Sequence, residues 1–160
     1  MTRTELSLPE LYVEDETAWL DAMADRIQAG AIHEIDYPNL GEYLTDMAKR
    51  DRREVESRLV VLLRHVLKWI YQPEYQSRSW RSSIVEQRQE LIRLASRGVL
   101  RNHADSVLNE VYPEAVERAA AETGLTLDAF PLECAFTVDE LFSFEPMLPG
   151  VRSESSEEMS

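Results

Sequence analysis

The chain has 160 residues, the length of one ordinary domain, and can bury a core without disulfides. It is 44% hydrophobic and 29% charged, as a globular protein is, and its single cysteine, Cys134, excludes an intramolecular disulfide and a multi-cysteine zinc site. No apolar run reaches the roughly 20 residues of a membrane span, and the polar start is unlike a signal peptide. We therefore expect no membrane association and a cytoplasmic location.

The net charge of −13 is distributed unevenly along the chain. Residues 49–101 contain 13 Lys/Arg against 6 Asp/Glu, whereas residues 1–48 contain 2 against 11 and residues 102–160 contain 2 against 13. The simpler interpretation is that acidic outer helices neutralise a basic central hairpin within one fold. The alternative is that part of the hairpin stays open to an anionic partner.

Helical spacing of apolar residues predicts the elements of the first half. The first helix covers about 14–29, with a stripe that includes Trp19, Met23 and Ile27, and Gly30 ends it. A second helix starts near Asp36, and the polar segment 49–53 suggests a bend before a long helix over 51–71. Pro73 ends that helix.

The second half is helical as well. The pattern predicts helices over 79–97, with Gly98 as the terminator, and over 103–123, ended by Gly124. Pro113 lies inside the latter, so we expect a kink or a break at Tyr112. Thr137 and Glu140 have the spacing of a capping box, which predicts a short final helix.

No strand pattern is present, so the fold class is all-α: a helical bundle of four main helices plus a short C-terminal helix. Residues 1–151 are expected to form a single domain. Residues 152–160 are acidic and serine-rich, and we expect them to be a disordered tail.

Two polar residues lie on or beside the apolar stripes of their helices. His65 flanks the stripe of the long helix, which is typical of a hydrogen-bonded structural histidine, although a ligand-binding or catalytic role is the alternative. Gln87 falls inside the stripe of its helix and should have partners. If the two helices pack antiparallel, the candidates are His65, Tyr71, Gln72 or a free backbone group near the Pro73 turn. A buried polar network is favoured over an active site.

The turn between these helices combines aromatic and cationic side chains. Such a mixture packs a helix hairpin through cation–π contacts, or it stacks bases and contacts phosphates. The candidate ligand- or partner-binding residues are Lys68, Trp69, Arg78, Trp80, Arg81, Gln87 and Arg88. No HExxH, phosphate loop or nucleophile elbow occurs, so we expect no metal and no cofactor, and Cys134 is expected to be packed rather than reactive.

Several of these residues together resemble a bacterial family, common in cyanobacteria, called domain of unknown function 29. The matching segments are His65–Pro73, Arg78–Trp80, Gln87–Arg88, Leu11–Leu20, Ile35–Asp36, Asn39–Leu40, Glu122–Leu125, Phe130–Pro131 and Cys134. The family pattern has a proline shortly after Cys134, where this chain has Ala135 and Phe136. The resemblance implies an all-α fold and carries no assigned activity or catalytic residues.

Three hypotheses for function follow. The first is a non-enzymatic interaction or regulatory module with a protein partner or a second copy, and we lean against an enzyme. The second is binding of nucleic acid or another polyanion through residues 49–101, which the overall negative charge opposes. The third is a hydrolase in which His65 is the acid/base and Lys68 or Arg88 stabilises an anion.

Overall fold

The computed structural model describes residues 5–148, and every regular element among them is a helix. The chain divides into two compact units, unit 1 (Met1–Arg50) and unit 2 (Asp51–Ser160). The all-α helical bundle is therefore confirmed, while the single domain over 1–151 stays a prediction. The expected disordered tail, 152–160, lies outside the described residues.

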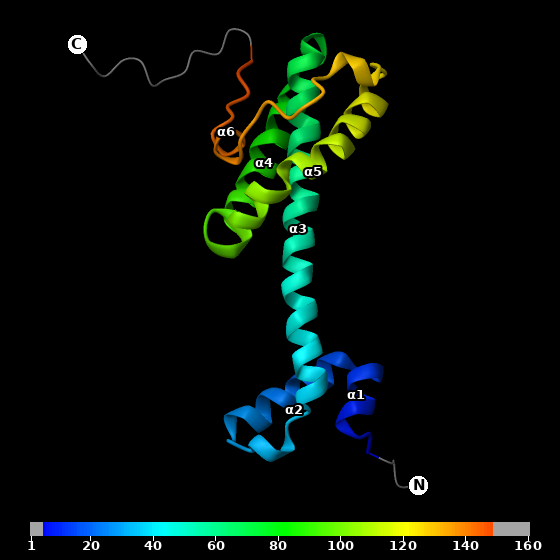
Figure 1. The fold of residues 1–160 in the computed structure, drawn as a ribbon, viewed down its shortest axis with the longest axis vertical. Coiled ribbons are helices and arrows are strands. Elements are labelled where there is room, and N and C mark those ends of the chain that lie inside the picture. The colour runs from blue at the N-terminus through cyan, green and yellow to red at the C-terminus, as the bar shows by residue number, and fades with distance from the viewer. Residues whose placement is uncertain (1–4, 149–160) are drawn as a thin grey trace, which may run out of the picture. The chain divides into compact units, whose positions relative to one another are not determined.

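Unit 1 begins with two helices, α1 (Leu8–Glu14) and α2 (Glu16–Gln28) (Figure 1). Ser7 and Glu10 form a capping box at the start of α1, with Ser7 N donating to Glu10 Oε2 over 2.9 Å. Asp15 separates the helices and caps α2, because its Oδ1 accepts from Ala18 N at 3.1 Å. The sequence pattern did not predict α1, because the polar cap at Ser7 precedes a segment with little apolar periodicity.

The core of unit 1 is built around Trp19 and Met23 of α2, which are its buried side chains among the described residues. The indole of Trp19 lies 4.7 Å from the Tyr12 ring and 5.9 Å from the Tyr43 ring, measured between centroids. Its Nε1 donates to Asp36 Oδ2 at 3.1 Å, so the buried N–H is satisfied. Ile27, expected in the same stripe, is instead exposed.

α3 (Tyr37–Tyr71) is one continuous helix that begins in unit 1 and ends in unit 2. The bend expected at 49–53 is wrong. Lys and Arg are good helix formers, and a solvated polar stretch without proline or glycine gives the backbone no reason to leave the helix. A 3₁₀ turn, Pro73–Tyr75, follows α3, as expected from the proline.

Unit 2 continues with α4 (Arg78–Ala95) and α5 (Gly98–Thr123). Gly98 does not merely end α4: with a φ of +72° it opens α5, which starts earlier than expected. α5 also continues through Pro113 without the expected break at Tyr112. Buried neighbours on both sides of the proline, Tyr112 and Ala115, hold the helix together by packing.

The core of unit 2 joins α3, α4 and α5 with the short α6 (Val138–Phe142). Its fully buried side chains include Leu59, Leu63, Ile84, Leu91 and Leu141. The capping box at the start of α6 is confirmed, since Glu140 N donates to Thr137 Oγ1 at 3.2 Å. A 3₁₀ turn, Leu127–Ala129, lies between α5 and α6. Among the helices described, none has the length and apolar character that crossing a bilayer requires.

Candidate functional site

The turn between α3 and α4 is held by side-chain bonds to the backbone. Gln76 Nε2 donates to the carbonyl of Trp69 at 2.8 Å, and Ser77 Oγ caps α4 by accepting from Trp80 N at 3.2 Å. Gln72 Nε2 reaches the carbonyl of Thr123 at 3.2 Å. These bonds place Trp69 in the core and Trp80 partly against it, so both tryptophans serve packing.

Lys68 is enclosed between an aromatic ring and a carboxylate. Its Nζ lies 4.6 Å from the ring centroid of Trp80 and 3.0 Å from Glu122 Oε2. Arg64 Nη1 contacts the other oxygen of Glu122 at 3.3 Å. One carboxylate from α5 therefore contacts two cations of α3, and the Lys68 side chain is only 12% exposed.

His65 is half-buried beside the same cations. Burial, and then the charges of Arg64 and Lys68, lower its pKa to about 4, with Glu122 acting weakly in the opposite direction. Arg64 Nη2 lies 3.4 Å from His65 Nε2, which suits a neutral ring with its proton on Nδ1. At neutral pH this imidazole is uncharged.

Gln87 does not contact the partners expected from the sequence. Its Oε1 accepts from Arg58 Nη1 of α3 at 3.5 Å, and Arg58 also contacts Glu54. The reason is the axial alignment of the two helices: Gln87 of α4 lies level with Arg58 of α3, which is two turns before His65. The side chain is half-buried rather than fully enclosed.

Three arginines of α4 face the segment that follows α6. Arg88 Nη1 donates to the carbonyl of Phe144 at 2.6 Å and to Glu145 Oε1 at 2.7 Å. Arg81 Nε donates to the carbonyl of Pro146 at 3.1 Å. Arg78, at the start of α4, is exposed. Apart from Gln87, which contacts Arg58, the candidate residues thus form an inner group around Lys68 and Trp80 and an outer group of arginines along this segment.

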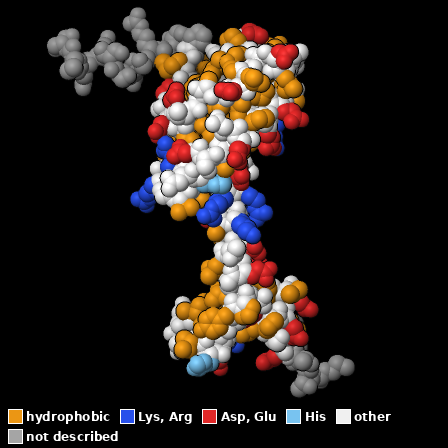
Figure 2. Space-filling view, in the orientation of Figure 1, with side chains coloured by type: hydrophobic (Ala, Val, Ile, Leu, Met, Phe, Trp, Pro, Cys, Tyr) orange, Lys and Arg blue, Asp and Glu red, His pale blue; other side chains and the backbone are white. Residues whose placement is uncertain are grey.

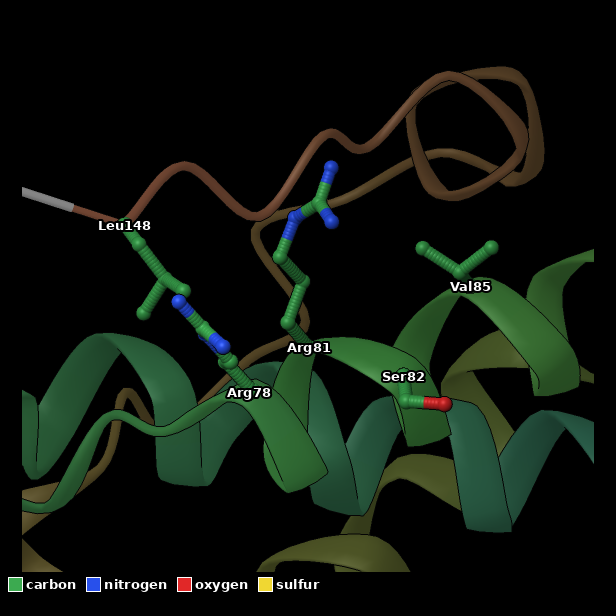
Figure 3. A pocket seen from close by; sticks show the side chains of 5 residues that line it. All are labelled: Arg78, Arg81, Ser82, Val85 and Leu148. Carbon is green, nitrogen blue, oxygen red and sulfur yellow. The ribbon is translucent and has the colours of Figure 1, made fainter. Parts of the chain in front are cut away.

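The outer arginines border a pocket of about 370 Å³ that we call the α4 pocket (Figure 3). It is lined by Arg78, Arg81, Ser82, Val85 and Leu148. Two of these residues were candidates from the sequence. Ser82, Val85 and Leu148 were not, because only the fold brings Leu148 beside α4.

A larger apolar groove of about 730 Å³ lies along the second half of α5. We call it the α5 groove; its lining is Tyr112, Pro113, Val116, Glu117, Leu127, Asp128, Phe130, Pro131 and Leu132. Figure 2 shows hydrophobic side chains gathered over α5 and the loop that follows it, with carboxylates among them. The exposed fraction is 95% for Leu132 and 59% for Leu127. Sequence periodicity could not find this groove, because its leucines lie in an irregular loop.

The floor of the groove is fixed by Tyr112, whose hydroxyl donates to the carbonyl of Pro131 at 2.7 Å. Burial, aided by the neighbouring Cys134 and Tyr71, raises the pKa of Tyr112 to about 12. Cys134 is half-buried, and its Sγ contacts the carbonyl of Phe136 at 3.4 Å. Burial raises the pKa of this thiol above its ordinary value. Over residues 5–148, no three His, Cys, Asp or Glu side chains gather in a way that could hold a metal ion.

Comparison with known families finds one model that matches residues 11–145 of this chain, described as "Domain of unknown function DUF29". The match covers most of the 160 residues, including the α3–α4 turn, the α4 arginines and the α5 groove. Neither the curated proteins nor the solved structures provide a match.

Proposed function

Because this chain belongs to the DUF29 family, whose description assigns no activity, we propose a function from its own surfaces. It is a helical interaction module whose α5 groove binds an apolar, basic segment of a partner protein. The observation that carries the proposal is the groove itself, an apolar depression in which Leu127 and Leu132 are presented to solvent. A cytoplasmic location and a single cooperative domain remain parts of the same proposal.

The size and lining of the groove suit a protein segment. Its volume, about 730 Å³, accommodates a few large side chains rather than one small ion. Covering a leucine such as Leu132 contributes roughly 1.5–3 kcal/mol, so a partner that covers both exposed leucines gains useful affinity from them alone. Exposed apolar patches with polar rims are typical of protein interaction sites.

Charge selects the kind of partner. Glu117 and Asp128 line the groove, and no Lys or Arg is among its lining residues. The chain as a whole carries a net charge of −13, which attracts a basic segment and repels nucleic acid. A second copy of this chain would bring the same negative charge. We therefore favour an amphipathic basic helix of a different protein as the occupant.

The contacts of the central hairpin support this proposal over its alternatives. Lys68 contacts Glu122 and Arg88 contacts Glu145, so each already has a carboxylate partner. His65 is uncharged at neutral pH. Lys68 faces α5, whereas Arg88 faces the segment after α6. A hydrolase would need Lys68 or Arg88 directed at a substrate beside His65, and each of them instead contacts a carboxylate of its own chain.

The test uses a fluorescently labelled helical peptide of about 18 residues, with leucines on one face and lysines on the other. Binding to the full chain is measured by anisotropy. We expect saturable binding that weakens at least about tenfold in Leu132→Glu, since burial of one leucine is worth that factor or more. Val99→Glu is the matched control, because Val99 is exposed on α5 and lies outside the groove lining.

Two further peptides test whether binding requires the amphipathic helix and the positive charge. A scrambled peptide of the same composition should bind much more weakly, and a version with glutamates in place of lysines should not bind. Equal binding of the helical and scrambled peptides would contradict the proposal. So would an equal loss of affinity in Leu132→Glu and Val99→Glu.

A further inference from the structure

The α4 pocket contains two cations that form no ion pair with a carboxylate among residues 5–148. Within residues 58–101, the cations that contact a described carboxylate are Arg58, Arg64, Lys68, Arg88, Arg93 and Arg101. Arg78 and Arg81 make no such ion pair with the residues that the structure describes, yet both line one pocket. Among the described residues, the acidic segments therefore supply no partner for these two arginines.

The orientation of Arg81 leaves hydrogen-bond donors available. Its Nε is taken by the carbonyl of Pro146 at 3.1 Å, which holds the guanidinium against the segment after α6. The Nη groups at the end of the fork have no hydrogen bond to the described residues. Figure 3 shows the guanidinium of Arg78 extending from the same helix beside Leu148. A carboxylate or phosphate is the group that such donors bind best.

The rest of the pocket is apolar. Val85 of α4 and Leu148 supply aliphatic surface, while the Ser82 hydroxyl points away from both guanidinium groups (Figure 3). A volume of about 370 Å³ exceeds what a free phosphate ion fills. Figure 3 shows Leu148 and Val85 on opposite sides of Arg81. The complementary ligand therefore has an anionic head for the arginines and a short hydrocarbon part for one of these two apolar surfaces.

We propose that the α4 pocket binds a small organic oxyanion, a carboxylate or phosphate monoester attached to a short aliphatic group. Arg81 and Arg78 bind the head, and the aliphatic group covers the apolar surface on one side of Arg81, either at Leu148 or at Val85 (Figure 3). The inference is independent of the α5 groove, because the two pockets share no lining residue. The proposal differs from the hypothesis of polyanion binding through residues 49–101, because it assigns the anion to a single site at Arg78 and Arg81.

The test is titration of the full chain with hexyl phosphate, hexanoate and inorganic phosphate at low salt. Calorimetry measures the affinity, and the Nε–Hε resonance of Arg81 in ¹H–¹⁵N spectra reports the place of binding. We expect a saturable shift of this resonance with hexyl phosphate or hexanoate. Inorganic phosphate should bind at least about fivefold more weakly, because it leaves the aliphatic surface uncovered.

Substitutions separate a specific site from general attraction to positive charge. Arg78→Gln and Arg81→Gln should each weaken hexyl phosphate binding by about tenfold or more. Arg93→Gln is the matched control, because Arg93 lies on the same helix but outside the pocket and pairs with Glu90. The Arg78 side chain makes no hydrogen bond to the residues that the structure describes, so Arg78→Gln removes no contact of the described fold. The proposal is overturned if Arg93→Gln has the same effect, if inorganic phosphate binds equally well, or if no ligand gives a saturable shift.

Discussion

Lys68 and Glu122 form an ion pair of 3.0 Å, Nζ to Oε2, that joins α3 to the last turn of α5. The same carboxylate contacts Arg64 at 3.3 Å, so Glu122 holds two cations of one helix. Because Lys68 is only 12% exposed and Arg64 21%, neither can easily exchange this partner for water. The acidic and basic segments thus meet in a specific contact at Glu122, in addition to having opposite net charges.

The first prediction concerns this carboxylate. Glu122→Gln should destabilise the fold by about 1 kcal/mol in urea unfolding, a modest loss because Glu122 itself is partly exposed. Glu114→Gln, on the same helix, removes only the pair with Arg118, in which both side chains are about half exposed. It should cost less than about 0.5 kcal/mol. Equal losses of unfolding free energy in the two variants would show that the Lys68–Glu122 pair stabilises the fold no more than the exposed Arg118–Glu114 pair.

The second prediction is a pH dependence of stability that arises from His65. Its pKa is about 4 in the folded chain and about 6.5 when unfolded, so the unfolded state binds more protons between these values. The stability that depends on the uncharged His65 is fully present above about pH 6.5 and is lost as the pH falls towards 4. We expect a loss of about 2 kcal/mol, which allows for partial screening by solvent.

Urea unfolding at several pH values measures this slope. His65→Gln should remove most of it between pH 6.5 and 4, whereas His33→Gln, in an exposed turn of unit 1, should leave it unchanged. Glu122→Gln should lower the pKa of His65 further, because that carboxylate raises it. If the unfolding free energy of His65→Gln depended on pH as strongly as that of the original chain, His65 would not be the source of the pH dependence.

The third prediction addresses how the two units fold. Trp19 is fully buried, and its N–H is satisfied by Asp36, so Trp19→Ala should cost roughly 3–5 kcal/mol. If unit 1 unfolds independently, hydrogen exchange will accelerate in α1 and α2 but not in α4 and α5. Parallel loss of protection in all four helices would instead support the single cooperative domain expected from the sequence.

The fourth prediction concerns Cys134. Because burial raises the pKa of its thiol, little thiolate is present at pH 8. Reaction with a chromogenic disulfide reagent should be about tenfold or more slower in the folded chain than in urea. A rapid reaction of the folded chain would show that Cys134 is accessible and would reopen a reactive role for it.

Most helix ends could be predicted because their signals are local. Pro73 ends α3 and Gly124 follows α5, and the capping pair Thr137 and Glu140 starts α6. Each signal acts through backbone geometry within a few residues, so no knowledge of the rest of the chain is needed. Gly98 follows the end of α4, as expected, but the next helix begins at this glycine rather than near 103.

The candidate residues could be selected from the sequence, but their partners could not. Gln87 was expected to meet residues near the α3–α4 turn, and it contacts Arg58 instead. Which residues meet across two helices depends on axial register, and periodicity along one helix carries no information about it. The α5 groove could not be predicted from the sequence for a related reason, since the solvent exposure of Leu132 follows from how its loop packs.

The sequence by itself determined the all-α fold, the helical hairpin and the basic segment between acidic ones. These follow from periodicity, local caps and counts of charge. Only the tertiary structure decided which charges meet: Lys68 with Glu122, Arg88 with Glu145, and neither Arg78 nor Arg81 with any described carboxylate. The attraction between two charges at a solvated surface is largely screened beyond about 10 Å, so it depends on positions in space that composition cannot specify.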